Sequence, residues 1–479
     1  MGTQDGLGWV SGISPLEPCW TREPDVAKIE LIARKHFKLH SSAACTVKLY
    51  EHGYFNKLYM VETEASTSIM CVNLPVHPIS KTNSEVATMN FVRQNTDIPV
   101  SQVLAFDDSS DNELGFEWIL MERIPGRPLR SRWRKTPLHV KEALVKEIAK
   151  YQVQLFRQRF SAIGNLFLSS SSRSGPIEHA ASQGTTEDSQ NTKNSDILLV
   201  DGEYLDEAFS ALKMNSQTPE GRNSTEEFST MVVNTKAAPL CDHAPQDFPR
   251  GPFTTSEAWL RARLELALAD QETIPKYSDE KDDIKDAHST REVIERLLRL
   301  LPSIFPPLSR ESGQSVLFHG DLSFQNILVD GNGKLTGIVD WDFISAVPLW
   351  KACQLPYFLQ GRPRDDEPDI DNLTALTIKS LNTYRWLLEE YELTKLKATF
   401  LEEMKRLEPA WIREFEESSL EADFELAVQT CDNRRQFNRR QFKLVQVWLD
   451  KREKSNIEPA GRLCEILHGY RRMDILFPA

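Results

Sequence analysis

The stretch that most constrains the fold runs from Phe318 to Asp342, FHGDLSFQNILVDGNGKLTGIVDWD. It reads as an acidic loop, a short apolar strand, a Gly-Asn-Gly turn and a second strand that ends in two carboxylates. Gly and Asn are frequent in hairpin turns because they tolerate the left-handed backbone conformation. A hairpin here would bring Asp340 back towards Asp321 and Asn326, so we expect three oxygen-bearing side chains to come together.

These residue types suit phosphoryl transfer. Moving a phosphoryl group from a nucleotide to an alcohol requires positioning and neutralisation of the phosphate charge, usually with magnesium. Magnesium prefers oxygen ligands and keeps several waters, so one carboxylate and one amide suffice beside the phosphates. We therefore expect Asn326 and Asp340 to hold the metal and Asp321 to act as the catalytic base. The alternative is an ordinary hairpin with a polar lead-in, since Asp and Asn are common in turns.

With His319 and Asp342 included, the pattern is His-x-Asp-x-x-x-x-Asn followed by a hairpin and Asp-x-Asp. This pattern resembles the aminoglycoside phosphotransferase and choline kinase-like superfamily, in particular its fungal-type phosphotransferase enzymes. The resemblance implies a two-lobed α+β fold like that of protein kinases, with a small antiparallel-sheet N-lobe and a mainly helical C-lobe. It also implies ATP and Mg²⁺ as cofactors and a hydroxyl group of a small molecule as acceptor. His319 would brace the loop, and Asp342 would support the metal or a substrate amine.

Length and polarity predict the domain organisation. A chain of 479 residues exceeds one ordinary hydrophobic core. We expect an N-terminal arm and helix at 1–44, an N-lobe at 45–124 and a C-lobe at 125–479. Residues from about 169 to 246 read as a polar insertion within the C-lobe, because they have too little apolar surface to offset the entropy of ordering.

Composition excludes several classes of partner. The net charge of −13 argues against a nucleic-acid binder or an anionic-membrane binder, because both need a basic surface. No apolar run is long enough to span a bilayer. We expect a cytoplasmic enzyme, and the acidic charge is compatible with a cationic acceptor. The sequence leaves the oligomeric state open.

The N-terminal third has the pattern of a small sheet with two helices. Asp25 can cap a helix whose apolar residues recur at helical spacing. Three strand-like runs follow, at 45–50, 58–63 and 69–74, and the next helix is expected at Ser84–Val92. By resemblance, the turn between the first two runs would cover the nucleotide, and the segment near residue 122 would hold adenine through its backbone. The candidate nucleotide-binding residues are Gly53, Tyr54, Phe55, Asn56, Met121, Glu122 and Ile124.

One position departs from the family pattern. Fungal-type members carry Lys or Arg two residues before the proline of the third strand, and this chain has Asn73 there. A neutral amide cannot supply the charge that stabilises nucleotide phosphates. Glu85 occupies the place of the family's helix glutamate, which would pair with that basic residue. The sequence leaves the partner of Glu85 open, because either Lys81 or Lys57 could replace the missing charge. Alternatively, Glu85 could be an acid in the first turn that the helix dipole favours.

The C-terminal two thirds read as helical. Thr254 and Glu257 are spaced as a capping box that opens a helix at Ser256–Asp270. Further amphipathic helices are expected at His139–Phe160, Thr290–Leu301, Leu373–Tyr391, Leu393–Leu407 and Glu421–Asp450.

Three alternatives to an active phosphotransferase remain. Asn73 favours a nucleotide-binding pseudokinase with a regulatory or scaffolding role. A protein kinase is disfavoured because the loop reads HGD and the second motif reads DWD. The third alternative is a helical interaction protein without enzymatic activity, for which replacing Asp321 would change nothing measurable.

Overall fold

The computed structural model describes residues 5–10, 17–168, 197–199, 251–277, 281–306, 314–369, 378–432, 439–454 and Leu463. The chain divides into two compact units. The first contains residues 1–124, 162–254 and 339–346, and the second contains residues 125–161, 255–338 and 347–479. Apart from residues 197–199, the predicted insertion at 169–246 lies outside the described residues.

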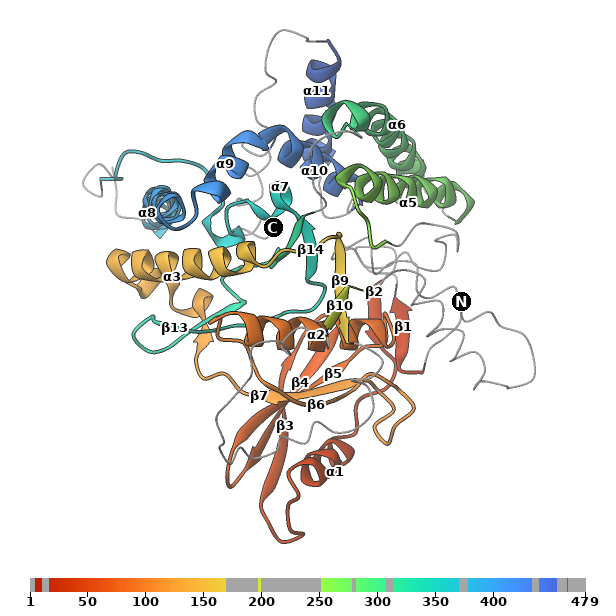
Figure 1. Ribbon diagram of the computed structural model, residues 1–479, viewed down its shortest axis with the longest axis vertical. Helices are drawn as coiled ribbons and strands as arrows, with labels where there is room; N and C mark the ends of the chain where they lie inside the picture. The colour runs from red at the N-terminus through yellow and green to blue at the C-terminus, as the bar shows by residue number, and fades with distance from the viewer. Residues whose placement is uncertain are drawn as a thin grey trace, which may run out of the picture. The chain divides into compact units, whose positions relative to one another are not determined.

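The first unit is built on a five-stranded antiparallel sheet in the order β3-β4-β5-β7-β6 (Figure 1). Its elements are β1 (Leu7–Val10), β2 (Glu17–Trp20), α1 (Val26–His36), β3 (Cys45–His52), β4 (Asn56–Thr63), β5 (Thr67–Asn73), α2 (Ser80–Asn95), β6 (Val103–Asp107), β7 (Trp118–Glu122), β9 (Gly164–Leu168) and β10 (Ile197–Leu199). The predicted antiparallel sheet near the N-terminus is confirmed.

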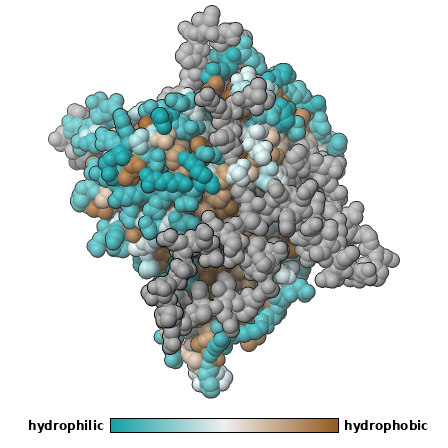
Figure 2. Space-filling model, viewed as in Figure 1, coloured by the Kyte–Doolittle hydropathy of each residue, from teal (hydrophilic) through white to brown (hydrophobic). Residues whose placement is uncertain are grey.

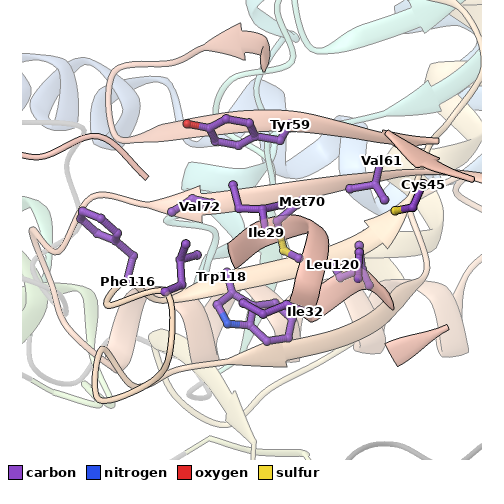
Figure 3. Close-up of a cluster of buried hydrophobic side chains, with 12 residues drawn as sticks. Ile29, Ile32, Cys45, Tyr59, Val61, Met70, Val72, Phe116, Trp118 and Leu120 are labelled. Atoms are coloured by element: carbon purple, nitrogen blue, oxygen red, sulfur yellow. The ribbon is translucent and has the colours of Figure 1, made fainter. Parts of the chain in front are cut away.

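Helix α1 packs on one face of this sheet. Its N-cap is Asp25, whose carboxylate accepts a hydrogen bond from the N–H of Ala27, as predicted. Ile29 and Ile32 on its inner side pack against side chains from four strands (Figure 3). Because side chains alternate along a strand, Met70 and Val72 of β5 belong to this core, whereas Cys71 and Asn73 point to the opposite face.

Helix α2 packs against β6, β7 and β9. It begins at Ser80, four residues before the predicted start at Ser84. The cause is a distant carboxylate, because Glu117 accepts hydrogen bonds from the N–H of Ile79 and the hydroxyl of Thr82. The extra turn brings Lys81 into the helix.

The second unit is mainly helical. Its elements are β8 (Arg127–Pro128), η1 (Leu129–Ser131), η2 (Trp133–Lys135), α3 (Leu138–Arg157), α5 (Ser256–Tyr277), α6 (Lys281–Ile304), β11 (Ser315–Phe318), β12 (Ile327–Val329), β13 (Leu335–Ile338), α7 (Leu349–Ala352), η5 (Tyr357–Leu359), α8 (Ile378–Leu407), α9 (Pro409–Glu417), α10 (Ser419–Asp432) and α11 (Arg439–Lys454). Strand β14 (Ser345–Pro348) begins in the first unit and pairs there with β9. Hydrophilic side chains cover the outward face around α3 (Figure 2), opposite buried residues such as Leu144 and Ile148.

Two helix predictions were wrong in detail. The two helices expected to break near residue 392 form the single helix α8, because no Gly or Pro interrupts the chain there. The long helix predicted at Glu421–Asp450 is described as α10 and α11, and residues 433–438 lie outside the described residues. The cap of α5 is Thr255, whose hydroxyl accepts from the N–H of Ala258, so the predicted capping residue Thr254 was off by one position.

Candidate functional site

The loop before β12 is held in one conformation by its own residues. The side-chain amide of Asn326 donates to the backbone carbonyl of Asp321 at 2.9 Å and to its carboxylate at 3.1 Å. The N–H of Ser323 donates to the carbonyl of Asp321 at 2.8 Å. These bonds orient the Asp321 carboxylate. His319 is buried, with 3% of its surface exposed.

Neighbouring aromatic rings support the same loop from within the second unit. The ring of Phe324 lies 4.8 Å from that of Trp133 and 5.8 Å from that of Phe358, between ring centroids. The backbone adds two bonds, since Arg130 donates to the carbonyl of Phe324 and Phe358 donates to that of Leu322. These ring contacts and backbone hydrogen bonds therefore hold the loop in place.

The hairpin after the loop forms as the sequence predicts. Strand β12 pairs with β13 and, on its other edge, with β8. Asp330 begins the turn, and its carboxylate accepts from the N–H groups of Asn332 and Lys334. Gly333 has φ of 83°, a conformation that favours glycine.

The segment after the hairpin carries Asp340 in a strained conformation within the first unit. Asp340 is exposed and has φ of 68°, and Phe343 has φ of 54°. Positive φ at residues other than glycine is uncommon and is concentrated at functional sites. Asp342, two residues on, is buried, with 8% of its surface exposed. The two carboxylates of this segment therefore lie in different environments, with Asp340 exposed and Asp342 buried.

The turn between β3 and β4 contains the predicted nucleotide-covering residues. The N–H of Gly53 donates to the carbonyl of Asn56 at 3.0 Å, and a Cβ on Gly53 would lie 2.4 Å from the Asn56 side chain. Tyr54 is exposed, and its ring lies 4.7 Å from that of Phe55. The Phe55 ring is in turn 5.7 Å from that of Phe343. The turn is thus tied to the segment that carries Asp340.

Lys81 lies at the centre of a buried charge cluster in the first unit. Its ammonium is 3.6 Å from the carboxylate of Glu85, one helical turn on, and 3.6 Å from that of Asp342. Only 2% of the Lys81 surface is exposed. The partner of Glu85, which the sequence left open, is therefore Lys81. Lys57, the other candidate, pairs with Glu23 and lies over the ring of Trp20.

Burial and neighbouring charges shift the pKa values in this cluster. Burial raises the pKa of Glu85 to about 7, although the charge of Lys81 opposes the shift. Burial alone would lower the pKa of Lys81, but the carboxylates of Glu85 and Asp342 outweigh it and hold that pKa above its usual range. Lys81 therefore stays charged. Burial lowers the pKa of His77 to about 4, helped by the charge of Lys81.

Asn73 is part of the same cluster. It lies at the end of β5, on the face towards α2, and its side chain bridges two helix residues. The amide oxygen accepts from the Lys81 ammonium at 2.9 Å, and the amide nitrogen donates to the hydroxyl of Thr82 at 2.8 Å. Sequence reasoning missed this role, because it placed Lys81 before the helix.

The predicted adenine-holding segment lies at the end of β7. Met121 is paired with Ile69 of β5 and with Val103 of β6. The N–H of Glu122 donates to the carbonyl of Gln102 at 2.9 Å, so this N–H already bonds to the segment before β6. Ile124 is the last residue of this part of the first unit. Contact with adenine stays a prediction for these residues.

The whole central part of the chain matches a known protein family. Residues 46–350 match the sequence profile of the phosphotransferase enzyme family, the aminoglycoside phosphotransferase (APH) family. The chain belongs to this family. The two-lobed α+β fold predicted for it, with a small antiparallel sheet before a mainly helical part, is also confirmed.

Curated relatives are similar over short stretches. The chain is 38% identical over 126 residues to a subtelomeric hrmA-associated cluster protein of Aspergillus fumigatus, covering 25% of this chain and 24% of that protein. It is 34% identical over 115 residues to clavilactone A biosynthesis cluster protein Y of Ampulloclitocybe clavipes, covering 24% of this chain and 27% of that protein. The alignments thus span about a quarter of these relatives.

The solved structures that match this chain are distant in sequence and have TM-scores below 0.5. A putative fructosamine-3-kinase from Haemophilus somnus has a TM-score of 0.44 at 11% identity, covering 88% of this chain and 96% of its own. The aminoglycoside phosphotransferase APH(4)-Ia, in a ternary complex with ADP and hygromycin B, has a TM-score of 0.41 at 12% identity, covering 92% of this chain and 98% of its own.

The described residues contain neither a metal-binding cluster nor a membrane-spanning helix. Among them, no group of three or more His, Cys, Asp and Glu side chains is arranged to hold a metal ion. Magnesium accepts a carboxylate and an amide oxygen and takes its other ligands from phosphates and water, so the residue types of the predicted ligands suit it. That Asn326 and Asp340 hold the metal stays a prediction. None of the helices in the described segments has the length and apolar character needed to cross a bilayer.

Proposed function

We propose that this protein transfers the γ-phosphoryl group of ATP to a hydroxyl group of a small molecule. The observation that carries the proposal is the fixed loop in which Asn326 orients the carboxylate of Asp321. Membership of the phosphotransferase enzyme family supports the same reaction.

In the proposed reaction Asp321 acts on the acceptor. The acceptor oxygen forms a bond to the γ-phosphorus, the bond from that phosphorus to the β–γ bridging oxygen breaks, and ADP leaves. Asp321 takes the hydroxyl proton. Its orientation by Asn326 matters because a base must be within hydrogen-bond reach of the proton it removes.

The remaining predicted residues would serve the nucleotide and its metal. Asn326 and Asp340 would hold Mg²⁺, which neutralises phosphate charge when bound. The backbone of Gly53–Asn56 would cover the phosphates, and Met121–Ile124 would contact adenine. His319 would brace the loop, which suits its burial.

The test is turnover of ATP with Mg²⁺ against a panel of amino alcohols, aminoglycosides and sugars. ADP release and a gain of one phosphoryl group by the acceptor, measured by mass spectrometry, would support the proposal. Asp321→Asn should lower kcat by roughly 10²–10⁴-fold, the usual contribution of a positioned base. The matched control is Asp111→Asn, which changes an exposed carboxylate and should leave kcat unchanged.

Two outcomes would contradict the proposal. If no acceptor is phosphorylated while ATP still binds, the chain is a nucleotide-binding pseudokinase. If Asp321→Asn and Asp111→Asn behave alike, Asp321 is not the base.

A further inference from the structure

We propose that Lys81, on helix α2, supplies the positive charge that holds the nucleotide phosphates, in place of a basic residue at position 73 on strand β5. The inference rests on the proposed function, because it assumes that the first unit binds a nucleotide. It assigns a phosphate-binding role to a residue outside the family pattern and gives Asn73 a purpose.

The charges around Lys81 are the first argument. One ammonium faces the carboxylates of Glu85 and Asp342, each 3.6 Å away, and Asp340 adds a third negative charge to the same field. A charge-assisted hydrogen bond between nitrogen and oxygen is typically about 2.7–2.9 Å long. Both ion pairs are longer than that. The carboxylates keep the ammonium charged, which a residue that holds phosphates must be.

Asn73 also holds the Lys81 ammonium in position. The 2.9 Å bond from Lys81 to the Asn73 amide oxygen directs the lysine from the helix to the end of β5. The amide nitrogen of Asn73 is itself fixed by Thr82. A lysine at position 73 would place a second cation against Lys81, whereas an amide accepts the hydrogen bond. Asn73 and Lys81 therefore act together: the helix supplies the charge, and the strand positions it.

The cluster also lies beside the turn that is predicted to cover the nucleotide. The Lys81 ammonium lies 5.7 Å from the centroid of the Phe343 ring, which lies 5.7 Å from that of Phe55 in the covering turn. The carbonyl of Phe55 accepts from the N–H of Leu74, the residue after Asn73. Backbone N–H groups in such turns can bind phosphate oxygens. Lys81 thus lies beside the turn predicted to cover the phosphates.

The arrangement has a mechanical consequence. In protein kinases the corresponding lysine is on a strand and its glutamate is on a helix, and activity is controlled through that pair. Here Lys81 and Glu85 share helix α2, so a displacement of the helix moves both and leaves their ion pair intact. Such a displacement would instead break contacts that leave the helix, namely the bonds of Asn73 with Lys81 and Thr82 and the ion pair of Lys81 with Asp342.

The experiment compares the binding of adenosine, ADP and ATP, each with Mg²⁺, by titration calorimetry on the full chain. Lys81→Met should weaken ATP and ADP by about tenfold or more, because a hydrogen bond to a charged group is worth roughly 1.5–3 kcal/mol. The affinity for adenosine, which has no phosphate, should change by less than about twofold. Thermal unfolding of each variant checks that it is folded.

Lys57→Met is the matched control. Lys57 is also a buried lysine of the first unit paired with a carboxylate, but it lies outside the cluster. Its replacement should leave the ratio of ATP to adenosine affinity unchanged. An equal fall of this ratio in Lys57→Met and Lys81→Met would overturn the inference, as would an unchanged ratio in Lys81→Met.

A double variant, Asn73→Lys with Lys81→Met, moves the charge back to the strand and keeps the total charge. It also remains informative if Lys81→Met alone does not fold. ATP preference close to that of the wild type supports the inference, because one cation has replaced another. A rise of about tenfold above the wild type would show that Lys81 had not supplied the charge and would overturn it.

The inference and the proposed function fail separately. Phosphoryl transfer with an unchanged ATP preference in Lys81→Met would leave the function standing and remove the role of Lys81. Loss of ATP preference in Lys81→Met without turnover of any acceptor would leave the role of Lys81 and remove the function. If the wild-type chain binds ATP no better than adenosine, the role of Lys81 is wrong.

Discussion

Each of the two units contains a buried charge network, and the two networks differ. In the second unit Arg263 donates to Glu425 at 2.7 Å and also to Asp432, while Lys351 lies 3.0 Å from Glu425. Two cations meet two anions at hydrogen-bond distance, and the Arg263 guanidinium stacks over the ring of Trp259. This network is balanced and closed.

The contacts of the network in the first unit are longer. One cation, Lys81, faces more than one carboxylate, and both of its ion-pair distances are 3.6 Å. Buried charges are costly unless they are paired and hydrogen-bonded. A network that satisfies this condition contributes to the fold, whereas one whose cation is held at longer distances contributes less. We expect the two to respond differently to mutation.

The largest effect on stability is expected from Arg263→Met. This change leaves Glu425 and Asp432 buried without their main partner, and breaking a buried ion pair typically costs about 3–5 kcal/mol. The free energy of unfolding, measured by urea denaturation, should fall by that amount, while ATP affinity changes little. Arg291→Met is the control, because Arg291 is exposed and its loss should change the free energy of unfolding little. Equal losses from both variants would refute the comparison.

The matched pair Glu425→Gln and Glu85→Gln tests the comparison directly. Burial disfavours the charge of Glu425, but Arg263 and Lys351 outweigh it and hold its pKa below the usual range. Burial raises the pKa of Glu85 to about 7. At pH 8 we expect Glu425→Gln to lower the free energy of unfolding by about 3 kcal/mol and Glu85→Gln to change it by less than about 1 kcal/mol. The reverse order would mean that the first network is the structural one.

The third effect depends on pH and concerns Glu117, the carboxylate at the start of α2. Burial raises the pKa of Glu117 to about 7, against its hydrogen bonds from Thr82 and Ile79. Between pH 4.5 and 7 the folded state therefore binds more protons than the unfolded state, so this group's stabilisation is complete below pH 4.5 and is lost as pH rises through 7. Over that range the contribution changes by about 3 kcal/mol.

Glu117→Gln should remove this contribution. Its free energy of unfolding relative to the wild type should rise between pH 5 and pH 8, measured by urea denaturation at several pH values. Glu64→Gln, at an exposed glutamate, is the control and should give a curve parallel to that of the wild type. A Glu117→Gln curve parallel to the wild type would show that Glu117 does not titrate with folding in this range.

Local sequence predicted some features of this fold and missed others. The hairpin after the Asp321 loop and the cap of α1 at Asp25 follow from turn and cap preferences, and both were predicted. The start of α2 was not, because Ser80, Thr82 and Ser84 are all acceptable near a helix start. The choice was made by Glu117, which lies 38 residues from Ile79 in the chain.

The sequence by itself determined the family, the α+β order of elements and the residue types of the Asp321–Asp342 stretch, because motif and turn chemistry are local properties. The tertiary structure decided which lysine serves Glu85. That choice depends on a helix that begins one turn early and on the face of β5 to which Asn73 points. Both depend on contacts between segments far apart in the chain, and spacing along the sequence does not report such contacts.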